Sequence, residues 1–325
     1  MACITKLFFT NHMKTTNRPL TFGRIAELWK ADKKNYVKRS TYAAYALVLA
    51  NHLTPAFGSC AGISEEQVQQ FVFDKLARGL SQKTIKDMLV VLKMVLKFGA
   101  KNGLADDYRP IDIRFPTDRS RSQIEVLSKD HQRRIMEHVT THFTFENLGI
   151  YLCLCTGLRI GELCALTWDD LDTETGVVRV RKTLQRIGVP DASAAARTEL
   201  LIDTPKSRNS IRDIPMSAEL LQMIRPWKRV VNGSLFVLTN DARPTEPRTY
   251  RNYYKRLLRE LELPPLKFHG LRHSFATRCI ESRCDYKTVS VLLGHSNIST
   301  TLNLYVHPNL EQKRRCVEQM SRSLR

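Results

Sequence analysis

The sequence predicts a mainly α-helical protein of two domains, a helical bundle followed by a larger α+β domain with a small β-sheet. Its 325 residues suggest two domains at roughly 150 residues each, and 42% hydrophobic residues suffice for two cores. Apolar residues recur at helical spacing over about 21–103, whereas β-branched runs typical of strands gather at about 177–214. These patterns divide the chain into an all-helical part and a mixed part.

The expected helical bundle covers residues 21–105 and follows a short arm, residues 1–20. Ser64 is a favourable N-cap for its third helix, and Glu65 and Glu66 in the first turn suit the helix dipole. Short turns between helices are typical of a small bundle. Its four helices are expected after Thr21, over 40–53, after Ser64 and after Ser81.

Residues 106–124 lose the helical pattern and hold two prolines among many charges, which favours an interdomain linker. The second domain is expected over 125–325. Its helices are expected at about 129–140, 145–155, 159–167, 217–230, 247–262, 270–282, 285–293, 298–304 and 309–323. The last of these, a tail from about 309, carries a narrow apolar stripe that could pack on its own core or on another subunit.

The charge balance indicates a polyanionic partner. Lys and Arg number 51 against 32 Asp and Glu, which gives a net charge of +19. Residues 1–115 carry 18 basic and 9 acidic side chains and the rest carry 33 and 23, so both domains are expected to contact nucleic acid. The alternative is an ordinary basic surface. Four lysines on the polar side of the fourth helix are candidate contacts: Lys83, Lys86, Lys93 and Lys97.

The eight cysteines form no repeated C-x-x-C pair with zinc spacing, and several lie in apolar runs. We therefore expect buried, reduced thiols and no metal site. The N-terminal apolar stretch is too short for a signal peptide, and no run approaches the roughly 20 apolar residues that cross a bilayer. The expected location is cytoplasmic.

Several short motifs contain polar and charged residues that could carry chemistry. In TGLRIGEL, Arg159 opens a helix and Glu162 lies three residues on, on the same face. In HGLRHSFAT, His269 and Arg272 are also three apart on one predicted helix. Each motif alone is explained better by a surface ion pair or by ordinary packing than by a catalytic role.

Two further segments complete the candidate set. In LLGHSNISTTLNLY, His295 follows a glycine that ends one helix, and Tyr305 ends the next helix. The segment Asp203–Pro215 is expected to form a β-hairpin with Lys206 at its polar turn. A lysine in a turn is usually only exposed to solvent. Lys206 therefore becomes a candidate site residue only when it is considered together with the other motifs.

In order and spacing, these residues resemble the tyrosine recombinases, the phage integrase family. The match runs through Arg159, Lys206, His269, Arg272, His295 and Tyr305. It covers the whole second domain, which the resemblance identifies as an α+β tyrosine-recombinase catalytic domain. RSTYAAY, LTPAFG and the lysine-rich fourth helix resemble the family's SAM-like core-binding domain more loosely.

The resemblance implies a DNA strand transferase that cleaves and rejoins double-stranded DNA through a 3′-phosphotyrosyl intermediate, with Tyr305 as the nucleophile. Arg159 and Arg272 would clamp the phosphate oxygens, because guanidinium matches phosphate bidentately. Lys206 would protonate the 5′-oxygen leaving group, as a general acid.

The other implied roles are supporting ones. His269 would assist proton transfer at the nucleophile, and His295 would donate a hydrogen bond to a phosphate oxygen. Glu162 would orient an arginine or a histidine. The resemblance also implies a homotetramer on DNA, with directionality or DNA-bending proteins as accessory partners. No P-loop or cluster of carboxylates is present in the sequence, so no metal or other cofactor is expected.

Within the family, the long segment Lys182–Thr204 favours an integrase of a phage or other mobile element over a chromosome-dimer-resolving recombinase. The short arm at residues 1–20 leaves no room for a separate arm-binding domain, so a simple integrase is expected. Two alternatives stay open: a type IB topoisomerase-like enzyme, and a catalytically silent DNA-binding regulator, which would lack a catalytic residue.

Overall fold

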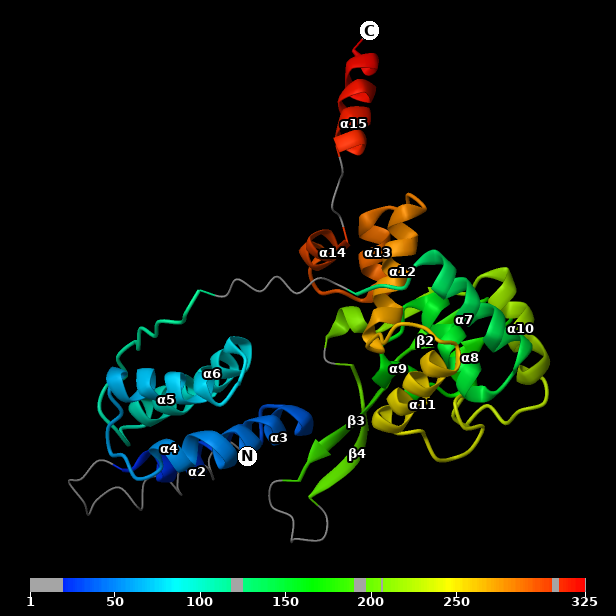
Figure 1. Ribbon diagram of the computed structural model, residues 1–325. Coiled ribbons are helices and arrows are strands. Elements are labelled where there is room, and N and C mark those ends of the chain that lie inside the picture. The colour runs from blue at the N-terminus through cyan, green and yellow to red at the C-terminus, as the bar shows by residue number, and fades with distance from the viewer. Residues whose placement is uncertain (1–19, 118–124, 190–196, 206, 306–309, 325) are drawn as a thin grey trace. The chain divides into compact units, whose positions relative to one another are not determined.

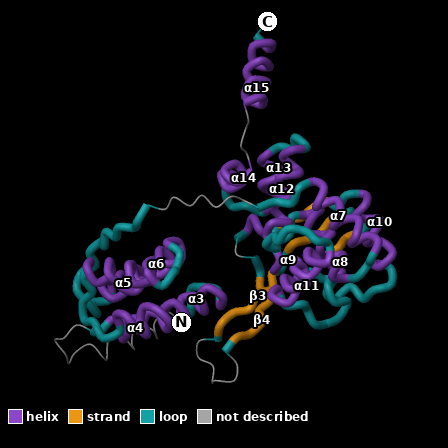
Figure 2. Tube along the Cα trace, in the orientation of Figure 1, coloured by secondary structure: helices purple, strands orange, loops and turns teal. Residues whose placement is uncertain are grey.

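The computed structural model describes residues 20–117, 125–189, 197–205, 207–305 and 310–324 (Figure 1). Helices dominate and strands form two small sheets (Figure 2), so the predicted fold class is confirmed. No helix in these described ranges is long and apolar enough to cross a bilayer. The chain divides into two compact units, Met1–Ser120 with Ile187–Glu199 and Arg121–Arg186 with Leu200–Arg325.

The first unit contains the predicted helical bundle. Its helices are α2 (Phe22–Lys33), α3 (Arg39–Val48), the π-helical turn η1 (Leu49–Leu53), α4 (Thr54–Phe57), α5 (Glu65–Ala77) and α6 (Gln82–Lys101). At the start of α5, the Gln67 N–H donates to the Ser64 hydroxyl at 3.3 Å, and the Ser64 N–H donates to Gln67 Oε1 at 2.9 Å. This reciprocal capping satisfies donors that a helix end leaves open, and it confirms the predicted start.

The second predicted helix, 40–53, is longer than expected. The elements α3, η1 and α4 follow one another without a break as far as Phe57. Pro55 does not stop them: it lies in the first turn of α4, directly after the π-helical turn η1. The continuation brings Leu53 and Phe57 into the same core as Phe22.

The first part of the predicted linker lies against this bundle. The Gln69 amide donates to the Arg114 carbonyl at 3.0 Å, and the Arg114 N–H donates to Gln69 Oε1 at 2.9 Å. Ile111 and Ile113 pack beside the bundle core, although charged residues surround them in the sequence. Residues 106–117 therefore continue the bundle, and the remainder of the predicted linker lies outside the described residues.

The second unit is organised around one buried helix, α8. Its helices are α7 (Lys129–Thr141), α8 (Phe145–Thr156), α9 (Ile160–Cys164), the 3-10 turn η2 (Trp168–Asp170), α10 (Ala218–Lys228), α11 (Pro247–Glu260), α12 (His269–Glu281), α13 (Tyr286–Leu293), α14 (Ile298–Tyr305) and α15 (Leu310–Ser323). Every residue of α8 from Asn147 to Leu154 is buried, and α7, α10, α11 and α12 pack around it. A helix that is apolar on all sides is stable only inside such a core.

The sheets correct one prediction. Strands β1 (Leu171–Asp172), β2 (Val177–Val180) and β5 (Arg212–Pro215) form one antiparallel sheet, β3 (Thr183–Gly188) pairs with β4 (Thr198–Asp203), and the 3-10 turn η3 (Arg208–Ser210) precedes β5. The expected hairpin over Asp203–Pro215 is therefore wrong. None of β4 is buried, whereas β5 buries Arg212 and Ile214, opposite Val180 and Val178 of β2. This alternation places β5 in the core sheet.

Candidate active site

The turn between α8 and α9 fixes the first predicted arginine. Gly157 ends α8 with φ 65°, and a Cβ atom there would lie 2.6 Å from the Phe275 ring, so only glycine fits. Arg159 precedes α9. Its backbone N–H donates to Glu162 Oε2 at 2.9 Å, and its Nη1 donates to Glu162 Oε1 at 2.7 Å. The predicted pairing across one helical turn is present.

The second predicted arginine, Arg272 of α12, is almost fully buried. Its Nη1 donates to the Gly157 carbonyl at 2.8 Å, and its Nη2 donates to the Leu293 carbonyl at the end of α13. Arg159 Nη2 reaches the adjacent Gly294 carbonyl at 3.2 Å. The turn after α13 therefore holds both guanidinium groups, and the turn after α8 also holds that of Arg272.

His295 lies on the second of these turns. Gly294 ends α13 with φ 66°, so the chain reverses directly before the histidine. The ring Nδ1 lies 2.8 Å from the hydroxyl of Thr301, which is fully buried in α14. This contact fixes the orientation of the ring. Thr301 lies within the motif LLGHSNISTTLNLY but was not among the predicted site residues, so it is a further functional candidate.

Both site histidines have lowered pKa values. Partial burial, followed by the charge of neighbours that include Arg272 and Arg159, lowers the pKa of His269 to about 4. Burial and then the same two arginines lower the pKa of His295 to about 4. Both rings are therefore neutral near pH 7, and a neutral imidazole offers one acceptor and one donor nitrogen. The shared influence of the arginines puts His269 in the same electrostatic site.

We expect the DNA-free protein to lose thermal stability as the pH falls from about 6.5 toward 4, in part through His295. The unfolded chain takes up a proton there near the ordinary pKa of 6.5, whereas the folded protein resists protonation down to about 4. Acid therefore favours unfolding in this window. A His295→Gln variant should give a flatter profile of Tm against pH. A profile parallel to that of the unaltered protein would contradict this expectation.

Sequence reasoning missed Arg212 of β5. Its Nη1 and Nη2 donate to Oε1 and Oε2 of Glu162 at 3.0 and 2.9 Å, and its Nε donates to the Leu292 carbonyl at 2.6 Å. Burial alone raises the pKa of Glu162, but Arg212 and then Arg159 outweigh it and hold the pKa below its usual value. Glu162 thus joins two arginines. The alternation of side chains along a strand could have predicted this burial, because it places Arg212 on the same face as buried Ile214.

An Arg212→Ala variant should lower the free energy of unfolding by about 3–5 kcal/mol, because it breaks a buried ion pair. The Arg212 and Glu162 side chains are only 4% and 3% exposed. The matched control is Arg179→Ala on neighbouring β2, whose ion pair with Asp172 leaves the arginine 47% exposed. That change should cost less than about 1 kcal/mol. Urea unfolding measures the free energy of unfolding of both variants. Equal losses in the two would contradict a stabilising role for the buried ion pair of Arg212 and Glu162.

Two predicted catalytic residues, Lys206 and Tyr305, have side chains outside the described part of the structure. Lys206 lies outside the described residues. The backbone of Tyr305 ends α14, where the sequence placed it, and its side chain lies outside the described part of the chain. Their roles stay predictions.

The four candidate DNA-contact lysines belong to the first unit and are all exposed on α6. Two of them have aromatic neighbours in residues 106–117, the described part of the predicted linker. Lys86 Nζ lies 4.8 Å from the Phe115 ring centroid, and Lys97 Nζ lies 5.3 Å from that of Tyr108. Such cation–π contacts orient a lysine without neutralising it.

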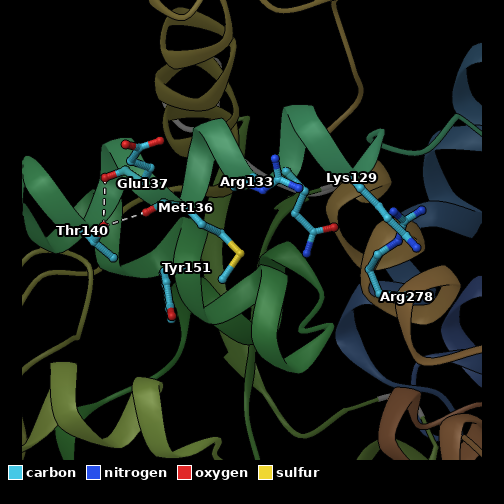
Figure 3. A pocket seen from close by; sticks show the side chains of 8 residues that line it. Lys129, Arg133, Met136, Glu137, Thr140, Tyr151 and Arg278 are labelled. Atoms are coloured by element: carbon cyan, nitrogen blue, oxygen red, sulfur yellow. Dashed lines mark hydrogen bonds between the residues drawn. The ribbon is translucent and has the colours of Figure 1, made fainter. Parts of the chain in front are cut away.

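A cavity of about 610 Å³ opens elsewhere on the second unit (Figure 3). One face of α7 lines it, together with Tyr151 of α8 and Arg278 of α12. None of the residues gathered around Arg159 and Arg272 lies among its lining residues. The candidate site is therefore separate from this cavity.

Comparison with known proteins decides the family. The phage integrase family matches residues 125–312, which is more than half of the chain. The chain belongs to the phage integrase family. Its N-terminal SAM-like domain matches residues 21–75 of this tyrosine recombinase, and the resemblance inferred from the motifs is confirmed.

Relatives of this tyrosine recombinase come from both branches considered above. It is 28% identical to a XerC-like tyrosine recombinase of Caldanaerobacter subterraneus subsp. tengcongensis, over 95% of this chain and 79% of that protein. It is 20% identical to the ICEBs1 integrase of Bacillus subtilis, over 94% and 84%. A solved structure of the Tn1549 transposon integrase with circular intermediate DNA superposes with a TM-score of 0.73 and 25% identity, over 93% of this chain and 100% of that one.

Proposed function

We propose that this tyrosine recombinase cleaves DNA by attack of Tyr305 on a phosphodiester, forming a 3′-phosphotyrosyl bond. The observation that carries the proposal is the anchoring of Arg159 and Arg272 to adjacent carbonyls of the same turn, the one that ends α13. A phosphodiester under attack gathers negative charge on its non-bridging oxygens, and fixed guanidinium donors stabilise that charge. The phosphotyrosyl bond retains the energy of the broken bond, so rejoining to a 5′-hydroxyl needs no ATP.

The two histidines manage protons and hydrogen bonds in this scheme. His269 accepts the phenol proton as Tyr305 attacks, for which a neutral ring is required. His295 donates to a phosphate oxygen. If the Thr301 hydroxyl donates to Nδ1, the ring proton lies on Nε2, and Nε2 is then the donor toward the phosphate.

Lys206 protonates the 5′-oxygen leaving group. Support comes from its immediate neighbours in the chain. Pro205 is buried, and the Asn209 side-chain amide donates to the His295 carbonyl at 3.4 Å. The segment that carries Lys206 is therefore tied to the turn that carries His295.

The partner is double-stranded DNA, and both units contribute to binding it. Lys83, Lys86, Lys93 and Lys97 contact the phosphate backbone, which fixes position and carries no sequence information. The active assembly is a homotetramer that brings two duplexes together, as the family resemblance implies. Directionality or DNA-bending proteins assist it in the manner expected of a mobile element.

We favour an integrase of a mobile element over a chromosome-dimer-resolving recombinase. The named relatives include an integrase of each of two elements, ICEBs1 and Tn1549. The long segment Lys182–Thr204, on which the sequence prediction of this branch depends, contains β3 and β4.

A supercoiled plasmid carrying two mapped attachment junctions of the host element tests the proposal. A recombinase converts it to two circles, or to an inverted circle, when the purified protein is added without a nucleotide. A type IB topoisomerase-like enzyme gives only relaxed topoisomers, and a silent regulator leaves the plasmid supercoiled. Either of the last two results would overturn the proposed function.

A further inference from the structure

The turn that ends α12 brings two cysteines together. Arg283 adopts a left-handed conformation with φ 64°. The Cys284 N–H donates to the Cys279 carbonyl at 3.0 Å, and the Arg283 N–H donates to the Ile280 carbonyl at 3.0 Å. This pair of hydrogen bonds defines a Schellman motif, in which the side chains at the positions of Cys279 and Cys284 meet.

The two thiols have different surroundings. The sequence predicted buried thiols, and Cys153 and Cys164 are buried, but Cys284 is exposed. Cys279 is half-buried against the small cluster between α12 and α13. Burial, and then the thiol of Cys284 beside it, raise the pKa of Cys279 to about 11. The Cys284 thiol is therefore the more accessible of the two to an oxidant, and the Cys279 thiol lies beside it.

We propose that Cys279 and Cys284 form a modification site for small-molecule disulfides such as oxidised glutathione. The Cys284 thiolate attacks one sulfur of the disulfide and releases one glutathione thiolate. Cys279 then loses its proton to solvent and attacks the Cys284 sulfur, which releases the second glutathione. One small disulfide is consumed, two glutathione thiols are formed, and the protein gains one disulfide bond.

This bond lies close to the catalytic framework in the chain. The turn joins α12, which carries Arg272, to α13, whose Leu293 carbonyl holds the same arginine. Because the two side chains already meet in the reduced turn, closure requires little movement of either helix. The modification therefore joins α12 to the turn that leads into α13, without taking a residue from the active site.

Tryptic digestion gives a direct test, because cleavage after Arg278, Arg283 and Lys287 separates the two cysteines. The full-length protein is incubated with oxidised glutathione, its remaining thiols are alkylated, and it is digested without reduction. We expect the peptides Cys279–Arg283 and Cys284–Lys287 to appear linked, two hydrogens lighter than their sum, and to separate on reduction.

Two variants and a control complete the experiment. Cys284→Ser and Cys279→Ser should each abolish the linked peptide, whereas Cys155→Ser, which removes a half-buried thiol of α8, should leave it unchanged. If the unaltered protein accumulates glutathione on Cys284 while Cys279 remains open to alkylation, the proposal is overturned. The readout is a peptide mass, so it does not depend on DNA cleavage.

Discussion

A Tyr305→Phe variant should form no covalent DNA adduct and should still bind DNA. The change removes one oxygen, which is the proposed nucleophile, and leaves the ring in place. Binding should fall by less than about tenfold, because a single hydrogen bond is worth about 1 kcal/mol. Labelled DNA nicked at the mapped junction traps the adduct, which denaturing gels reveal, while a gel-shift titration measures binding.

The matched control for this change is Tyr286→Phe. Tyr286 lies at the start of α13 and is 41% exposed, so loss of its hydroxyl should leave adduct formation intact. An adduct formed by Tyr305→Phe would show that another residue attacks the phosphate.

A Lys206→Ala variant should cleave ordinary DNA about 10²–10⁴-fold more slowly, which is the usual contribution of a general acid. The same variant should cleave at a near-normal rate a substrate whose 5′-bridging oxygen is replaced by sulfur. A thiolate leaves without protonation, so the lysine is no longer needed. Single-turnover cleavage rates on the two substrates give the comparison.

The control lysine is Lys255, which is exposed on α11. Lys255→Ala should cleave both substrates at the rates of the unaltered protein. If sulfur substitution fails to rescue Lys206→Ala, the lysine acts in binding or positioning, and the leaving group takes its proton from another source.

Features set by neighbouring residues were predictable from the sequence. The capping side chains of α5 and α6, at Ser64 and Ser81, lie where the pattern put them. The pair of Arg159 and Glu162 also follows from spacing along one helical turn. Each of these depends on contacts within a few residues, which a sequence displays directly.

Features set by distant partners were not predictable in the same way. Asp203 and Pro215 end strands of different sheets, because β2 pairs with β5 through alternating buried residues. The link from Arg212 to Glu162 spans fifty positions and exists only once that strand pairing forms. The docking of residues 106–117 likewise depends on side chains such as Gln69 that lie far back in the chain.

The turn at Gly294 determines how much of the chain must be synthesised before the two arginines can be anchored. A Cβ atom there would lie 2.7 Å from the Asn209 carbonyl, so two distant segments cross with no room for a side chain. The carbonyls beside this crossing hold both Arg159 and Arg272. During synthesis, a nascent chain that has not yet emerged past residue 294 lacks these anchors. The arginine pair therefore cannot be assembled until the turn at Gly294 has emerged from the ribosome.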